Sequence, residues 1–117
     1  GHVTAMLIYK IFRTPEWDDL QRQGQTLGAL IDVADGFVHF STALQANETC
    51  AKYFAGVDGL VLAALDADTL GADLIWEPSR GGALFPHLYR TLSLADILWH
   101  RDLPLGPTGH IFPDNML

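Results

Sequence analysis

Two short stretches of the sequence concentrate side chains that can bind or transform a ligand. In the first, "DGFVHFST", His39 and Ser41 stand two residues apart. On a strand they project from the same face about 6–7 Å apart, so an imidazole and a hydroxyl would reach one ligand together. The neighbouring Thr42 joins this candidate ligand-binding group. The alternative is that His39 is a half-buried histidine hydrogen-bonded within the fold.

The second stretch, "WEPSRGGALFPHLYR", begins at Trp76 and is unusually polar and constrained. Trp76 offers an apolar wall, Glu77 a carboxylate and Arg80 a cationic fork. Gly81 and Gly82 leave the backbone amides open to a phosphate or a carboxylate. These residues form a second candidate binding group.

Further along the same stretch, His87 and Tyr89 share a face if the segment is extended. Two prolines bracket the glycines and indicate an ordered loop, which is where binding groups tend to lie. The alternative is an internal turn in which Glu77 pairs with Arg80. Cys50 is the only cysteine and the histidines are scattered, so we expect a core thiol, no disulfide and no metal.

Length and composition predict one compact domain over residues 6–117. Of the 117 residues 49% are apolar and only 18% are charged, which is typical of a globular chain rather than a disordered one. Residues 1–5 are interpreted as a tag remnant or a disordered N-terminus. The oligomeric state is left open.

The charge of the chain restricts its partners. A formal net charge of -7 disfavours an extended nucleic-acid surface and attraction to an anionic membrane. The chain has no long apolar run and no signal-peptide pattern, which predicts a cytoplasmic protein. A small nucleotide-like molecule is the expected partner.

The elements that would position the candidate residues follow from local patterns. We expect a buried strand over Met6–Phe12, a helix over Pro15–Gln23 that Gly24 ends, and a second helix within residues 43–56. Further strands are expected over Leu60–Leu65, from Leu74, near Leu88–Leu92, and over Ile97–Asp102 after a helical turn.

The gaps between the later strands are too short for parallel crossovers. The fold class is therefore α+β: a compact single domain with a curved, mostly antiparallel sheet and two main helices.

Taken together, "DGFVHFST", "WEPSRGGALFPHLYR" and the later "LPLGPTG" closely resemble the bacterial family called domain of unknown function 952. The resemblance covers most of the chain, from Leu7 to about Gly109. It implies an ADP-ribosyltransferase-like fold, in which a split, curved antiparallel sheet holds NAD.

The resemblance also implies roles for individual residues. In that fold group a strand bearing His-x-Ser offers its histidine to the adenosine-side ribose and its serine to the nicotinamide-side ribose, a pattern that His39 and Ser41 match. A tyrosine stacks on nicotinamide, and either Tyr53 or Tyr89 is available for this.

A glutamate stabilises the cationic transition state in such enzymes, which gives Glu77 a catalytic role. In a variant of that chemistry, Arg80 pairs with a phosphate and His87 donates a hydrogen bond to a developing charge.

Three functions remain in view. The chain is an ADP-ribosyl or related group transferase that uses NAD as its substrate, a non-catalytic small-ligand-binding module, or a structural or interaction domain without a ligand. The first two require both stretches to line one cleft.

Overall fold

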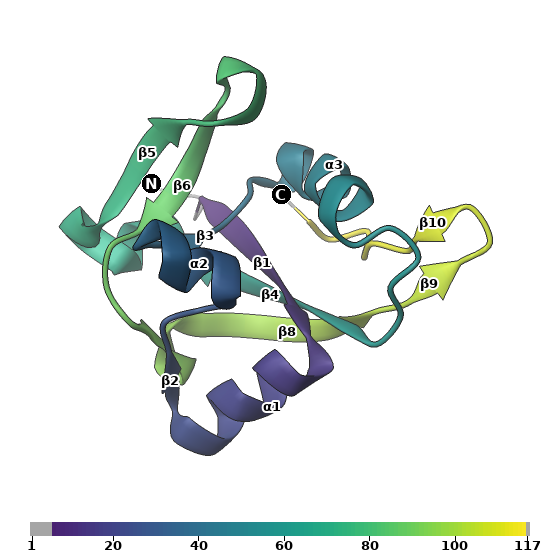
Figure 1. The fold of residues 1–117 in the computed structure, drawn as a ribbon, viewed down its shortest axis with the longest axis horizontal. Helices are drawn as coiled ribbons and strands as arrows, with labels where there is room; N and C mark the ends of the chain where they lie inside the picture. The colour runs from purple at the N-terminus through teal and green to yellow at the C-terminus, as the bar shows by residue number, and fades with distance from the viewer. Residues whose placement is uncertain (1–5, 117) are drawn as a thin grey trace, which may run out of the picture.

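The computed structural model describes residues 6–116, except for the side chain of Arg80. Two three-stranded antiparallel sheets form its frame (Figure 1). The first has the strand order β1-β4-β8, with bounds Leu7–Arg13, Leu60–Asp66 and Ile97–Leu103.

The central strand of this sheet explains the apolar run "LVLAAL". β4 pairs with β1 on one side and β8 on the other, and Leu60–Leu65 are all buried. Val61 and Ala63 face one core, and Leu62 and Ala64 face the other. A strand covered on both faces needs apolar side chains at every position, not at alternate ones.

The second sheet has the order β3-β6-β5, with bounds Val38–His39, Leu84–Leu88 and Leu74–Pro78. Its register places His39 of β3 directly opposite His87 of β6. Residues opposite each other on antiparallel strands point to the same face. Two histidines that lie far apart in the sequence are therefore neighbours.

The two sheets meet in the segment that follows β3. Phe40 N–H donates to Pro86 O at 3.1 Å in the second sheet. Ser41 exchanges two backbone hydrogen bonds with Tyr9 of β1, at 2.7 and 2.8 Å. The chain thus crosses from one sheet to the other directly after His39.

Within residues 6–116, three α-helices accompany the sheets: α1 (Thr14–Gln23), α2 (Leu30–Asp35) and α3 (Ala43–Tyr53). Gly24 ends α1 in the left-handed conformation that glycine adopts readily. Thr42 caps α3, because its hydroxyl accepts from Gln45 N–H at 3.3 Å.

The first sheet is the middle layer of the molecule. On the face of the first sheet that carries Ile8, one core forms with α1 and the second sheet. On the face that carries Tyr9, the other core forms with Cys50 of α3 and the C-terminal segment. Short strands and 3₁₀ turns complete the chain: β2 (Gln25–Thr26) with β7 (Leu92–Ser93), β9 (Leu105–Gly106) with β10 (Gly109–His110), η1 (Ala67–Asp73), η2 (Arg80–Gly82) and η3 (Leu94–Asp96).

The predicted α+β class with antiparallel strands is confirmed, as are the two main helices. The single curved sheet is divided into two main sheets. The strand expected near Leu88–Leu92 is interrupted, because Leu88 ends β6, Leu92 begins β7 and residues 89–91 only connect them. Helix α2 was not predicted, because six residues show no clear period and Leu30 is 90% exposed. Residues 1–5, interpreted as a tag remnant or disordered N-terminus, lie outside the described residues.

Candidate functional site

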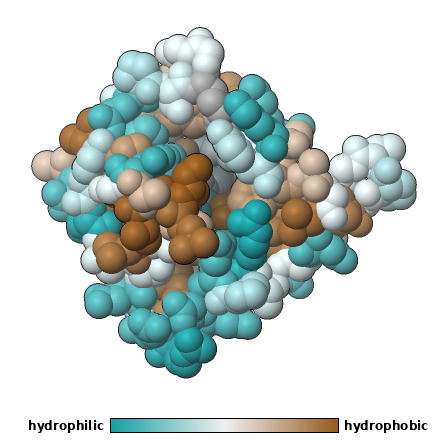
Figure 2. All heavy atoms as spheres, in the orientation of Figure 1, coloured by the Kyte–Doolittle hydropathy of each residue, from teal (hydrophilic) through white to brown (hydrophobic). Residues whose placement is uncertain are grey.

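A cavity of about 710 Å³ opens beside the point where the chain crosses between the sheets. Strand β1, helices α2 and α3 and the end of β6 all contribute residues to its lining. Figure 2 shows brown apolar residues over α2 beside a hollow in this face, and Leu30 and Ile31 of α2 line the cavity. The cavity thus combines an apolar rim with the polar walls described below.

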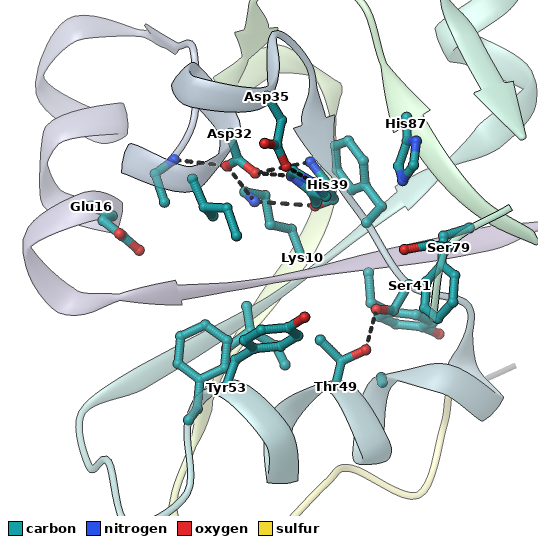
Figure 3. A pocket seen from close by; sticks show the side chains of 18 of the residues that line it. Lys10, Glu16, Asp32, Asp35, His39, Ser41, Thr49, Tyr53, Ser79 and His87 are labelled. Carbon is teal, nitrogen blue, oxygen red and sulfur yellow. Dashed lines mark hydrogen bonds and ion pairs between the residues drawn. The ribbon is translucent and has the colours of Figure 1, made fainter. Parts of the chain in front are cut away.

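The first wall is a buried charge network centred on Asp32, which is 1% exposed (Figure 3). Its Oδ2 lies 2.9 Å from Lys10 Nζ and accepts from Ala29 N–H at 2.7 Å. Its Oδ1 lies 2.5 Å from His39 Nδ1 and accepts from His39 N–H at 3.1 Å. One carboxylate therefore fixes both a lysine and the candidate histidine.

This network determines the charge state of Asp32. Burial disfavours the ionised carboxylate, but the hydrogen bond from His39 and the charge of Lys10 outweigh burial and lower the pKa of Asp32 to about 2. Asp32 is therefore a carboxylate at neutral pH, and Lys10 compensates its charge.

His39 is held on both sides of its ring. Its Nε2 lies 3.0 Å from Asp35 Oδ2, while its Nδ1 contacts Asp32. Carboxylates only accept hydrogen bonds, so both contacts are hydrogen bonds at once only when the ring carries two protons. Asp35 lies at the end of α2 and its side chain is 45% exposed, so a ligand group can take its place.

The opposite wall carries hydroxyl groups and an aromatic ring. Ser41 Oγ lies 3.0 Å from Thr49 Oγ1 of α3, and Tyr53 lies at the end of the same helix (Figure 3). All three residues line the cavity. This wall offers hydroxyl hydrogen bonds at one point and a flat apolar surface at another.

The third wall is formed by His87, which is 5% exposed. Its Nδ1 lies 2.8 Å from Glu77 Oε1, and the same oxygen accepts from Tyr89 O–H at 2.5 Å. Hydrogen bonds from Tyr89 and His87 lower the pKa of Glu77, and the bond to Glu77 raises the pKa of Tyr89. Glu77 does not line the cavity itself but holds the Nδ1 side of the His87 ring.

The structure brings four of the predicted residues to one cavity: His39, Ser41, His87 and Tyr53. Six others do not line it: Thr42, Trp76, Glu77, Gly81, Gly82 and Tyr89. Thr42 caps α3, Trp76 packs on the first core, and the two glycines have left-handed φ angles of +67° and +82° in an exposed turn. The side chain of Arg80 lies outside the described part of the chain.

The sequence interpretation missed Lys10, Asp32 and Asp35. A signal was present in "MLIYKIF", where Lys10 is the one charge in a strand expected to be buried. Lysine is almost never buried without a partner, so an acid had to face it. The sequence did not say which acid, because Asp32 reaches Lys10 only through the tertiary fold.

A comparison with protein families decides where this chain belongs. The family described as protein of unknown function DUF952 matches residues 11–100, which is more than half of the chain. The chain belongs to the DUF952 family.

The chain is also similar in sequence and fold to solved structures. The crystal structure of CC0527 from Caulobacter crescentus is 51% identical, with a TM-score of 0.85 over 89% of this chain and 91% of that chain. The solution NMR structure of CC0527 is 50% identical, with a TM-score of 0.81 over 90% of each chain. No curated protein matches this DUF952 chain.

Among residues 6–116, no cluster of three or more His, Cys, Asp or Glu side chains could hold a metal ion. No helix in this described range is long and apolar enough to span a bilayer.

Proposed function

We propose that this DUF952 protein binds a nucleotide such as NAD or ADP-ribose in the cavity between its sheets, and transfers the ADP-ribosyl or a related group. One observation carries the proposal: His39 and Ser41, two residues apart, and Tyr53 from the following helix all line one cavity of about 710 Å³. This volume lies within the usual range for small-ligand pockets, about 300–1,000 Å³.

The placement suits the parts of such a nucleotide. His39 offers a ring nitrogen to a ribose hydroxyl once Asp35 turns away, and Ser41 offers a hydroxyl nearby. Tyr53 provides a flat surface for a nicotinamide or adenine ring. In this assignment Tyr53, and not the distant Tyr89, stacks on the ring.

The charges around the cavity suit a cationic group. Three acids, Glu16, Asp32 and Asp35, line it together with Lys10 and Arg13. Lys10 pairs with Asp32 and Arg13 lies 3.9 Å from Glu16, so the carboxylate of Asp35 is left without a lysine or arginine partner in the described part of the chain. The nicotinamide ring of NAD is positively charged, and cleavage of its glycosidic bond develops positive charge on the ribose. The carboxylate of Asp35, left without such a partner among the described residues, favours both.

A non-catalytic binding module is the second candidate. Glu77, the carboxylate with the expected catalytic role, does not line the cavity. A protein with the same cavity but no reaction would bind ADP-ribose and leave NAD intact.

Thermal shift and calorimetry with NAD, ADP-ribose and nicotinamide test the binding. Stabilisation follows mass action, so a ligand at 100 times its Kd raises stability by about 2.7 kcal/mol. We expect His39→Ala to weaken ADP-ribose binding at least tenfold and His100→Ala, outside the cavity, to leave it unchanged. If millimolar NAD and ADP-ribose both leave the melting temperature unchanged, the proposed function is wrong. Nicotinamide release from NAD over hours separates the transferase from the binding module.

A further inference from the structure

His87 has one ring nitrogen engaged and one available. Its Nδ1 lies 2.8 Å from Glu77 Oε1, but no residue in the described part of the chain hydrogen-bonds its Nε2. The side chain is only 6% exposed, and His87 lines the cavity. In Figure 3 the ring points from β6 toward the side of the cavity where Ser79 and Ser41 lie. A buried polar atom at a cavity wall that has no partner in the protein takes one from solvent or from a ligand.

The Glu77 contact determines which nitrogen carries the proton. Glu77 is ionised at neutral pH, because hydrogen bonds from Tyr89 and His87 lower its pKa. A carboxylate only accepts, so Nδ1 of His87 must donate and carry the hydrogen. In the neutral ring Nε2 is then a bare acceptor that faces away from Glu77.

The ring is also fixed in orientation. Phe37 stacks on His87 with ring centroids 4.1 Å apart and planes at 23°. The same Phe37 ring packs on His39 at 4.6 Å, and the two histidine rings are 5.3 Å apart. A side chain held by a stack and a charge-assisted hydrogen bond loses little freedom on binding, which is the condition for precise proton transfer.

We propose that Nε2 of His87 accepts the proton of an attacking hydroxyl or water in the group transfer, and that Glu77 is the residue that positions it. The proposal rests on the proposed function, because it assigns a reaction to the same cavity. The acceptor of the transferred group is an alcohol or water, because each has an O–H proton that a neutral imidazole can take.

The O–H proton of the acceptor moves to Nε2, and the acceptor oxygen forms a bond to C1′ of the nicotinamide-side ribose. The C1′–N bond breaks, and nicotinamide leaves as a neutral molecule with the bonding electron pair. His87 becomes an imidazolium whose Nδ1–H still donates to Glu77, so the carboxylate compensates the new charge.

The tautomer of His87 is tested without any ligand. Long-range ¹H–¹⁵N spectra of the full chain at pH 8 should show His87 with the hydrogen on Nδ1. In Glu77→Gln the amide can donate to Nδ1, and the hydrogen should shift toward Nε2. Glu48→Gln, an exposed glutamate of α3 outside the cavity, is the matched control and should leave the spectrum unchanged. Hydrogen on Nε2 in the parent chain would overturn the proposal.

Turnover and binding are measured on the same variants. We expect Glu77→Gln to reduce nicotinamide release from NAD at least tenfold and to change ADP-ribose affinity less than threefold, because Glu77 does not line the cavity. Equal rates of nicotinamide release from NAD in Glu77→Gln and Glu48→Gln would also overturn the proton-transfer proposal. Circular dichroism of each variant confirms that the fold is retained.

The two proposals fail in different ways. If the parent chain binds neither NAD nor ADP-ribose, the proposed function is lost and the proton transfer with it. If it binds ADP-ribose but releases no nicotinamide, the binding site stands and only the proton-transfer proposal is rejected.

Discussion

At the scale of single residues, Asp32 has the largest effect on the candidate site. It receives hydrogen bonds or an ion pair from β1, from the start of α2 and from both the backbone and the ring of His39. A buried carboxylate with this many partners is stabilising only while all of them remain, because each lost partner leaves an unpaired buried group.

The stability of the protein should therefore depend on pH through Asp32. Its pKa is about 2 in the folded chain against an ordinary value of 3.8, so the folded state is favoured fully above pH 3.8 and loses this contribution as the pH falls toward 2. A pKa shift of this size corresponds to about 2 kcal/mol in the free energy of unfolding. Urea unfolding at a series of pH values measures this pH-dependent contribution to the free energy of unfolding.

The comparison variant is Asp32→Asn together with Lys10→Met, which removes both charges and avoids an unpaired buried lysine. This double variant should lose the acid-dependent part of the free energy of unfolding. Asp18→Asn, on the exposed face of α1, should retain it. An unchanged pH dependence in the double variant would show that other carboxylates cause it.

At the scale of elements, the short helix α2 carries Asp32 and Asp35, and the loop before it must approach Asp32 closely. Gly28 has a φ of +98°, and a Cβ at this position would lie 2.1 Å from Asp32 Oδ2. Glycine is required here for both space and backbone conformation. The position of the network thus depends on a residue that has no side chain.

We expect Gly28→Ala to destabilise the protein by about 3 kcal/mol, because it adds a steric clash to the cost of a left-handed alanine. Gly24→Ala is the matched control: Gly24 has a φ of +79°, but no atom lies within 4 Å of its Cβ position. Gly24→Ala should lower the free energy of unfolding by about 1 kcal/mol. Thermal denaturation measures both, and equal losses would show that the contact with Asp32 is unimportant.

At the scale of the whole molecule, two cores lie on opposite faces of the first sheet. Cys50 of α3 is 1% exposed and belongs to the core that contains Tyr9 and Leu62. Burial raises the pKa of its thiol to about 11. Little of the reactive thiolate therefore exists while this core stays closed.

Thiol labelling reports on that opening. At pH 8 Cys50 in the native protein should react with a disulfide reagent at least 100-fold more slowly than in urea, because little thiolate exists and access is closed. Cys50→Ala with Ala51→Cys moves the thiol to an exposed neighbouring position and should react rapidly without urea. Fast labelling of native Cys50 would contradict the assignment of this core.

The sequence alone determined the local features of the fold. The apolar run at Leu60–Leu65, the glycine that ends α1 and the turn before Ile97 are set by neighbouring residues, and each appears where it was expected. The pair of His39 and Ser41 was also visible, because strand geometry alone places residues two apart on one face.

Only the tertiary structure decided which groups share the cavity. Lys10, Asp32 and His39 come from three elements, and His87 faces His39 through a strand register that no local pattern encodes. Glu77 shows the difference most clearly: its position in the sequence suggested a group that faces the ligand, whereas the fold places it outside the cavity lining, hydrogen-bonded to Nδ1 of His87. Strand pairing is a long-range interaction, so the residues near a strand cannot by themselves determine what lies across from it.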